Sequence, residues 1–411
     1  VVPAYREAPG MLDRLRRLPS GPGRTLVILV LNRPDSDPDG ESNRALREAL
    51  QHLPPSDNFA GKGGRPQISA LNRHTDLYCH DMERLQGPCP KAQGVGLARK
   101  TGCDIVLKGR SEGGIRTGWI CSTDADAQLP GDYFLRLQDT AYAAICFPFW
   151  HVPGPDPLCN RATALYELRL HHFVLGLEYA ASPYAWHSLG SCMAVREEAY
   201  AQVRGFPRRA GGEDFYLLNK LTKVGRIATP GGACIALQSR DSRRVPFGTG
   251  PAVAKIGAAR DPSALPLFYH PLCFEALRAV LEAISQMWQA PAAERPTLLA
   301  ARGLDPPLQR ACCSVLEMLG FTEALAHCRR QGRTPAQFLR QFHQWFDAFR
   351  TLKFIHGLRA AGWADQPLAT LQQPAPPFWP GTTEGVAAPE GLCQAVREYR
   401  GWVTGGDQLR W

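Results

Sequence analysis

Short apolar runs alternate with amphipathic stretches up to about residue 250 of the chain. Thr25–Leu31 combines β-branched residues with leucine, which is typical of a parallel strand buried on both faces. Shorter runs that we also expect to be strands occupy Val1–Ala4, Trp119–Thr123 and Gly190–Val195. The alternation predicts an α/β fold with a Rossmann-like, mostly parallel sheet and helices on both faces.

The stretches between these runs carry helical periodicity. Helices are expected at Met11–Leu18, Ser42–Leu53, Gly94–Thr101, Ala162–Tyr179 and Glu197–Val203. Residues 55–90 are rich in turn-forming residues and allow no assignment. Later the pattern changes to long helices, at Phe274–Trp288, Leu308–Leu319, Thr322–Arg330 and Pro335–Leu358. We therefore divide the chain into an α/β domain, residues 1–260, and a mainly helical C-terminal region, residues 261–411.

The composition is that of an ordinary globular protein with a basic surplus. Of 411 residues, 44% are hydrophobic and 21% are charged, and the formal net charge is +9. A surplus carried mainly by arginine suits ligands that bear phosphate, and the aromatic-basic pattern of a nucleic-acid-binding module is missing. No apolar run reaches the roughly 20 residues that a membrane span needs. The sequence opens without an initiator methionine, so we expect native residues before Val1.

The 13 cysteines are scattered and show no disulfide-framework spacing. They fit the reducing cytoplasm, where cysteine serves as a small apolar residue. His74, Cys79, His80 and Cys89 are close enough in sequence to suggest a zinc site. Because their spacing matches no familiar ligand pattern, we favour the interpretation without a metal.

An acidic pair follows the Trp119–Thr123 run. Asp124 and Asp126 are one residue apart, and in a strand such residues point to the same face. Parallel sheets bind ligands beyond the carboxyl ends of their strands. Two carboxylates there suit Mg²⁺ or Mn²⁺ carrying a phosphorylated substrate. The alternative is a pair of solvated turn aspartates that cap the next helix.

Three further motifs accompany this pair. In chain order the four are Pro3-Ala4-Tyr5-Arg6-Glu7, the glycine-rich residues 94–102, Asp124-Ala125-Asp126, and Gly211-Gly212-Glu213-Asp214. Together, over roughly residues 1–250, they resemble the family-2-type inverting glycosyltransferases, which have the nucleotide-sugar-binding GT-A fold. The resemblance implies that residues 1–260 form a catalytic domain. Its expected activity is a metal-dependent transfer of a hexose from a nucleoside-diphosphate sugar to an acceptor hydroxyl.

The resemblance also assigns a metal site and a base. Asp126 is expected to ligate Mg²⁺ or Mn²⁺, and Asp124 is expected also to approach the ribose or the sugar. Asp214, with Glu213 beside it, is expected to be the catalytic base. The apolar run after these two acids predicts a helix start, whose amide dipoles keep a carboxylate ionised. Taken without the resemblance, both acids could be ordinary first-turn residues that stabilise a helix.

The donor nucleotide is expected to lie between the start of the chain and the acidic pair. The residues that the resemblance places against it include Pro3, Ala4, Tyr5, Glu7, Asp124 and Ala125. Tyr5 would contribute a ring contact and Glu7 a hydrogen bond to the ribose. After the second strand the family carries an aspartate that reads the base, and this chain has Asn32, whose amide can donate and accept. UDP-linked and GDP-linked sugars therefore both stay open.

Arginines are the candidates for binding the diphosphate. They are Arg99, Arg240, Arg243 and Arg244. Arg99, next to Lys100, would face base or phosphate, although both could equally be solvated cations on a helix surface. The other three fall where the family has a mobile loop over the donor, and arginine forks bind diphosphate oxygens well. Gly248 and Gly250 would give that loop its hinge.

The acceptor is less constrained by the sequence. Processive members of the family carry Gln-x-x-Arg-Trp and membrane helices near this loop, and this chain has neither. We therefore expect single sugar additions to a small soluble acceptor in the cytoplasm, with no nucleic-acid partner. Trp186 and His187 could line the acceptor pocket, although a core tryptophan is the more common role.

Two other functions fit parts of the sequence. A sugar-phosphate nucleotidyltransferase has a similar fold, but it needs a glycine-rich loop with Arg or Lys directly after the first strand, where this chain continues Pro3-Ala4-Tyr5. A non-catalytic nucleotide-sugar-binding protein, with a helical tail for a partner, is the third interpretation. The two acidic motifs argue against lost chemistry.

Overall fold

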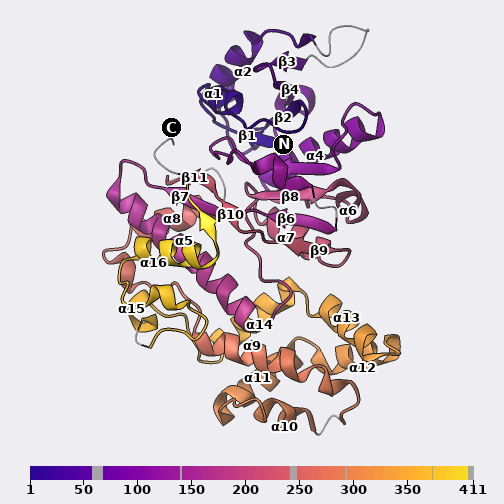
Figure 1. Cartoon of the computed structure of the whole chain (residues 1–411), viewed down its shortest axis with the longest axis vertical. Coiled ribbons are helices and arrows are strands. Elements are labelled where there is room, and N and C mark those ends of the chain that lie inside the picture. The colour runs from indigo at the N-terminus through magenta and orange to yellow at the C-terminus, as the bar shows by residue number, and fades with distance from the viewer. Residues whose placement is uncertain (58–67, 139–140, 241–247, 292–293, 373, 406–411) are drawn as a thin grey trace. The chain divides into compact units, whose positions relative to one another are not determined.

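A computed structural model describes residues 1–57, 68–138, 141–240, 248–291, 294–372 and 374–405 (Figure 1). The described chain divides into two compact units. The first comprises Val1–Thr163, Ser188–Gly257 and Arg400–Trp411. The second comprises Ala164–His187 and Ala258–Tyr399. Each unit is assembled from separate segments of the chain, and one of the divisions falls after Gly257. The expected domains, residues 1–260 and 261–411, stay a prediction.

The first unit contains a four-stranded sheet in the order β1-β2-β4-β3. Its strands are β1 (Val2–Ala4), β2 (Thr25–Leu31), β3 (Ile68–Ala70) and β4 (Thr75–Asp81). β1, β2 and β4 are parallel, and β3 pairs with β4 antiparallel. β2 is the strand predicted from its apolar run, and its last five residues are buried.

β4 lies in the stretch that sequence patterns left unassigned. Its apolar pattern is weak because polar residues are buried within it and find partners far away in sequence. Asp76 is 1% exposed, and its carboxylate accepts hydrogen bonds from Arg24 and Ser56 at 2.8 Å each. A buried polar side chain with satisfied hydrogen bonds is compatible with a central strand, but the pattern of neighbouring residues does not predict such a strand.

The second sheet of this unit has the order β5-β8-β6-β9. Its strands are β5 (Trp119–Ser122), β6 (Tyr142–Cys146), β8 (Met193–Arg196) and β9 (Arg226–Ala228). β8 is antiparallel to both β5 and β6, whereas β9 is parallel to β6. The expected mostly parallel sheet is thus a mixed one, since a short buried strand shows the same apolar run in either direction.

The backbone of Val1 connects the two sheets. Its nitrogen donates to the carbonyl of Cys121 at 2.7 Å, and its carbonyl accepts from the amide of Thr123 at 3.1 Å. The edge of the first sheet therefore continues into β5. Two smaller pairs, both parallel, complete the strands: β7 (Phe149–Val152) with β11 (Ile235–Gln238), and β10 (Gly232–Ala233) with β12 (Trp402–Val403).

Helices pack around these strands (Figure 1). In the first unit they are α1 (Met11–Arg16), α2 (Arg44–Gln51), α3 (Met82–Gln86), α4 (Gly94–Ser111), α6 (Glu197–Gln202), α7 (Glu213–Leu221) and α8 (Thr249–Gly257). α4 extends ten residues past the predicted end at Thr101, because Cys103 and Val106 continue its buried face. Gly102 lets α4 approach the sheet closely, since a Cβ there would lie 2.4 Å from Val1 Cγ1.

The second unit is helical. Its helices are α9 (Pro271–Ala283), α10 (Arg295–Ala300), α11 (Pro306–Met318), α12 (Phe321–Gln331), α13 (Pro335–Trp345), α14 (Ala348–Ala360), α15 (Leu368–Leu371) and α16 (Pro389–Tyr399), together with most of α5 (Pro157–Tyr179). The long helix predicted over Pro335–Leu358 is two helices, because Asp347 caps a new start by accepting from the Arg350 amide at 3.1 Å. None of the described helices combines the length and apolar composition needed to cross a bilayer.

Candidate active site

The acidic pair lies in the turn that follows β5. The turn is closed by a hydrogen bond of 3.2 Å from the Ala127 amide to the Asp124 carbonyl. Asp124 and Asp126 therefore do not share a strand face, which corrects the expected geometry. Ala125 between them is 3% exposed, and its carbonyl accepts from Arg14 Nε at 2.9 Å. One hydrogen bond within the turn and one from the Arg14 side chain to its backbone thus hold the turn in place.

A buried arginine connects this turn to α7. The guanidinium of Arg99 donates from Nη2 to Asp124 Oδ1 at 2.6 Å, and from Nε to Glu213 Oε1 at 3.0 Å. Its third nitrogen, Nη1, donates to Ser122 Oγ at 2.8 Å. Arg99 is only 3% exposed, while the Asp124 side chain is 38% exposed. Two acidic motifs that lie far apart in sequence therefore meet at one cation.

Arg99 was expected to face a base or a phosphate, or to be solvated. The solvated alternative is wrong, because Arg99 is 3% exposed and each of its guanidinium nitrogens has a partner inside the protein. Burial alone would lower the pKa of Arg99, but Asp124 and Glu213 outweigh burial and raise it. Lys100 pairs with Asp104 at 3.0 Å near the surface. Arg99 thus holds carboxylates in position rather than offering a free cation to a ligand.

The helix predicted at Gly-Gly-Glu-Asp is α7, and Gly212 precedes it with φ +67°. Glu213 is 4% exposed and Asp214 is half-buried. The Asp214 carboxylate accepts from the backbone amides of Phe215, at 2.7 Å, and Gly190. Burial, together with repulsion from Glu213, nevertheless raises the pKa of Asp214 to about 7. A carboxyl group with such a pKa exchanges its proton near neutral pH.

Gly190 completes this cluster, a residue that the sequence did not single out. Its carbonyl accepts from Ser122 Oγ at 2.8 Å. A Cβ at this position would lie 2.8–2.9 Å from the guanidinium of Arg99. The signal available in the sequence was the Gly190-Ser191 pair at the start of the predicted strand, where a glycine marks a close approach of other groups.

Arg240 approaches the other aspartate of the pair. Its Nη2 lies 2.5 Å from Asp126 Oδ2 and 3.9 Å from Glu7 Oε1. The arginine side chain is 33% exposed, and those of Asp126 and Glu7 are 16% and 9% exposed. The expected diphosphate-binding arginine therefore pairs with the expected metal ligand. Arg243 and Arg244 lie outside the described residues.

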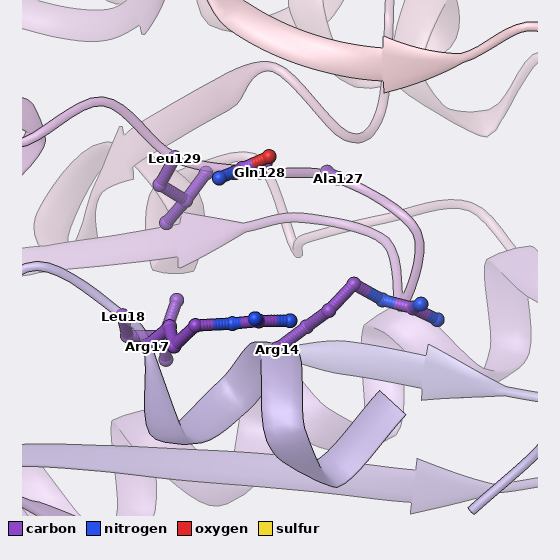
Figure 2. A pocket seen from close by; sticks show the side chains of 6 residues that line it. All are labelled: Arg14, Arg17, Leu18, Ala127, Gln128 and Leu129. Carbon is purple, nitrogen blue, oxygen red and sulfur yellow. The ribbon is translucent and has the colours of Figure 1, made fainter. Parts of the chain in front are cut away.

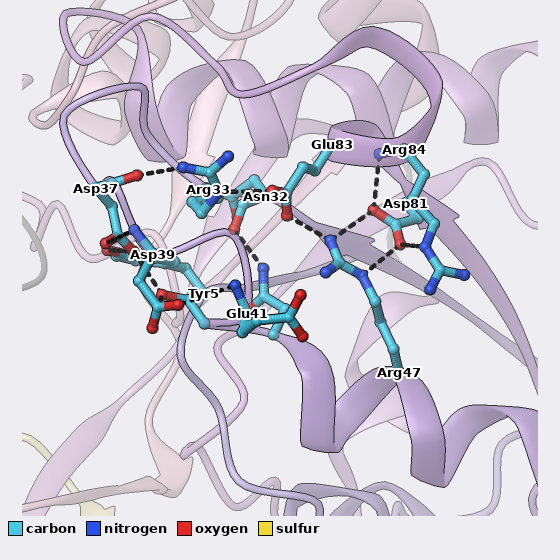
Figure 3. Close-up of polar contacts among 12 residues, drawn as sticks. Tyr5, Asn32, Arg33, Asp37, Asp39, Glu41, Arg47, Asp81, Glu83 and Arg84 are labelled. Atoms are coloured by element: carbon cyan, nitrogen blue, oxygen red, sulfur yellow. Dashed lines mark hydrogen bonds and ion pairs between the residues drawn. The ribbon is translucent and has the colours of Figure 1, made fainter.

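Tyr5, which follows β1 and was expected to contact the nucleotide, belongs to a second polar cluster (Figure 3). The hydroxyl of Tyr5 donates to Asp37 at 2.8 Å, and burial with this contact raises the pKa of Tyr5 to about 12. Burial would raise the pKa of Asp37, but hydrogen bonds from Ser42 and Tyr5 lower it to about 2. Pro3 is partly exposed and Ala4 is buried within β1. Asp37 is thus an ionised partner of Tyr5.

Asn32 does not stand open to a base, contrary to expectation. It is 6% exposed, and its carbonyl accepts from Asn43 Nδ2 at 3.0 Å. Nearby, Arg47 reaches from α2 to Asp81 at 2.8 Å and to Glu83 (Figure 3). The aspartate-rich stretch 35–39, directly after β2, was the signal for acidic groups at this edge of the sheet.

The carboxylates of the turn match a cation that is held jointly with a substrate. Asp124 keeps one carboxylate oxygen without a partner in the described chain, whereas the Asp126 carboxylate is paired with Arg240. Mg²⁺ is typically bound by one or two carboxylates plus waters and substrate phosphates. Within the described residues, no group of three or more His, Cys, Asp or Glu side chains could hold a metal. That covers His74, Cys79, His80 and Cys89 as well.

The remaining candidates lie elsewhere. Trp186 and His187 belong to the second unit and are 5% and 7% exposed, which is the core role that was the alternative to acceptor binding. Gly248 has φ +114°, in the region that favours glycine, and Gly250 lies buried in α8.

The sequence matches no known protein family and no curated protein sequence. Among solved structures, the chain is similar to a mannosyltransferase from Pyrobaculum calidifontis, determined in complex with GDP-Man and Mn²⁺. The two are 16% identical, the match covers 89% of this chain and 86% of the other, and the TM-score is 0.34. The function proposed below therefore rests on the geometry of the chain itself.

Proposed function

We propose that the protein is a glycosyltransferase of the inverting type, which moves a hexose from a UDP- or GDP-linked donor to the hydroxyl of a small soluble acceptor. One observation carries this proposal: Arg99 joins Asp124 of the Asp-x-Asp turn to Glu213 at the start of α7. Asp124, which we expect to bind the donor, and Glu213, the neighbour of the proposed base Asp214, are thus joined through one arginine. Such an arrangement suits a transfer in which leaving group and attacking hydroxyl are handled together.

Asp214 is the proposed catalytic base. In an inverting transfer the acceptor hydroxyl attacks the anomeric carbon, the bond to the diphosphate breaks, and the hydroxyl proton passes to the base. A base works best when its pKa is close to the working pH, and that of Asp214 is raised to about 7. Glu213 is already paired with Arg99, so Asp214 is the carboxylate left to accept a proton.

The turn and Arg240 would handle the leaving diphosphate. Asp124 and Asp126 would hold Mg²⁺ or Mn²⁺, which when bound supplies positive charge that neutralises the diphosphate. Arg240 must release Asp126 for this, and its guanidinium is then free to bind phosphate oxygens. We infer that Arg240 exchanges one anionic partner for another as the donor binds.

The nucleotide would lie along the end of β1, against Pro3, Ala4, Tyr5 and Glu7. The Tyr5 hydroxyl is held by Asp37, which fixes the ring in one orientation. A ring held in this way offers a stable face for a base or ribose. All 13 cysteines are free, which agrees with a proposed cytoplasmic location.

The test is turnover of UDP- and GDP-linked sugars, with Mn²⁺ or Mg²⁺, followed by release of the nucleoside diphosphate. Asp214→Asn should lower kcat by 10²-fold or more, on the order expected for a lost general base, while donor binding is kept. Asp104→Asn, which changes a more exposed acid on α4, is the matched control and should retain activity. Equal turnover by wild type and Asp214→Asn would refute the assignment. Release of pyrophosphate from sugar phosphate and a nucleoside triphosphate would indicate a nucleotidyltransferase instead.

A further inference from the structure

A small hollow that is partly open to solvent lies beside the Asp-x-Asp turn (Figure 2). The residues that line it are Arg14, Arg17, Leu18, Ala127, Gln128 and Leu129. In Figure 2 the two arginines extend from the end of α1 along one wall, and the 127–129 segment forms the opposite wall. Nothing in the proposed transfer uses this hollow.

The charges of the lining are unbalanced. Arg14 uses Nε to donate to the Ala125 carbonyl at 2.9 Å, and within the described chain its remaining guanidinium N–H groups have no partner. Arg17 makes no side-chain hydrogen bond or ion pair with any described residue. Arg16, between them, is paired with Asp13 at 2.6 Å. No carboxylate is among the lining residues.

We propose that this hollow binds a phosphate group, at a site separate from the donor carboxylates. The guanidinium groups of Arg14 and Arg17 lie along one wall of the hollow, and such groups form charge-assisted hydrogen bonds that favour phosphate oxygens. The side-chain amide of Gln128 adds a further donor on the facing wall. The ligand class is therefore a phosphate monoester or inorganic phosphate.

The site is positioned to influence the donor turn. Arg14 holds the carbonyl of Ala125, which lies between Asp124 and Asp126. On the facing wall, Gln128 and Ala236 exchange backbone hydrogen bonds of 2.8 and 3.0 Å. β11, which contains Ala236, ends two residues before Arg240, the partner of Asp126. An anion that draws Arg14 or Gln128 toward itself therefore acts on both sides of the Asp126 contact, which makes donor affinity dependent on phosphate.

The binding claim stands apart from the proposed transfer reaction, and it is tested without turnover. Inorganic phosphate is titrated against wild type, Arg17→Ala, and the matched control Arg16→Ala, with calorimetry and thermal unfolding as readouts. Wild type and Arg16→Ala should bind with equal affinity. Arg17→Ala should bind roughly tenfold more weakly or worse, since it removes one of the two guanidinium groups that donate charge-assisted hydrogen bonds to the phosphate. Arg17 is exposed, so its removal leaves the fold intact.

A second arm uses UDP and GDP with Mn²⁺. Arg17→Ala should keep the wild-type affinity for the nucleotide, and phosphate should change that affinity in wild type but less in Arg17→Ala. Unchanged phosphate binding in Arg17→Ala would overturn the site. A loss of nucleotide binding as large as the loss of phosphate binding would show that the hollow is part of the donor site, which also overturns the proposal. Failure of the transferase assay, by contrast, would leave the phosphate result as it stands.

Discussion

One buried ionisable group in each unit shows how differently a protein interior can accommodate a polar side chain. In the first unit Arg99 stays charged between Asp124 and Glu213. In the second unit His172 is fully buried and neutral, because burial lowers its pKa to about 4. Rings of Phe268, Phe274, Phe378 and Trp379 surround His172.

The hydrogen bonds of His172 are complete without a charge. Its Nε2 lies 2.9 Å from the Tyr269 carbonyl, and its Nδ1 accepts from Trp379 Nε1 at 3.1 Å. A neutral imidazole with Nε2 as donor satisfies both contacts. A buried ion cluster, by comparison, is seldom the most stable choice for a core, and perturbed carboxylates concentrate at functional sites. The second unit also buries an ion pair, between Glu167 and Arg397. The raised pKa of Asp214, beside the Arg99 cluster, is therefore the feature that points to chemistry in the first unit.

The largest expected effect comes from removing the charge that the first unit keeps. Arg99→Met leaves Glu213 buried without its partner, so the free energy of unfolding should fall by about 3–5 kcal/mol. Arg99→Lys keeps the charge but not the three hydrogen bonds of the guanidinium. Its free energy of unfolding should therefore lie between those of wild type and Arg99→Met. Denaturant unfolding measures all three, and Arg16→Met, at an exposed position, should stay near wild type. If the free energy of unfolding of Arg99→Met fell as little as that of Arg16→Met, Arg99 would not be an important stabiliser of the first unit.

Next in size is the dependence of the transfer rate on pH. A base must be ionised, so kcat/KM should fall about tenfold for each pH unit below the pKa of Asp214, which is about 7. The initial rate at subsaturating donor, measured from pH 5 to 9, gives this profile. A rate that stays level from pH 5 upward would mean that another group accepts the proton.

The same carboxyl group should affect stability with a definite sign. Its pKa is higher in the fold than the ordinary value of 3.8, so the folded state binds the proton more tightly than the unfolded chain. The resulting stabilisation is complete below pH 3.8 and is lost as the pH rises through about 7. The melting temperature of Asp214→Asn relative to wild type should therefore climb from pH 4 to pH 8. A constant difference would contradict the raised pKa.

The smallest effect is expected at His172, with the opposite sign. Its pKa is lower in the fold than the ordinary value of 6.5, so the unfolded chain binds the proton more tightly. Stability is then lost as the pH falls from 6.5 to about 4. Wild type should lose up to about 3 kcal/mol relative to His172→Gln over this range, by linkage. If the stabilities of wild type and His172→Gln changed in parallel with pH, protonation of His172 would not destabilise the second unit.

Sequence reasoning reached those elements whose cause is local. The apolar run of Thr25–Leu31 predicted β2, and the acids after Gly212 predicted the start of α7, because each pattern reflects neighbouring residues. The position of Arg99 could not be predicted. In the sequence, Arg99 lies next to Lys100 in a predicted helix, which is typical of a surface cation. It is buried because α7 and Gly190, which are far away in sequence, pack against it.

Two further differences have the same origin. The reversed direction of β8 depends on how the chain returns to β5, and a buried run carries no sign of direction. The pairing of Arg240 with Asp126 joins groups more than a hundred positions apart. Long-range pairing is the information that periodicity and spacing do not contain.

Gly190 offers a way to separate geometry from charge at this site. Alanine at that position would press a methyl group against a guanidinium that three partners already hold, yet every ionisable group would be kept. Any resulting change in turnover would measure how strongly activity depends on the positions of the carboxylates. The absence of a side chain at position 190 therefore sets how closely the charged groups of this cluster can pack.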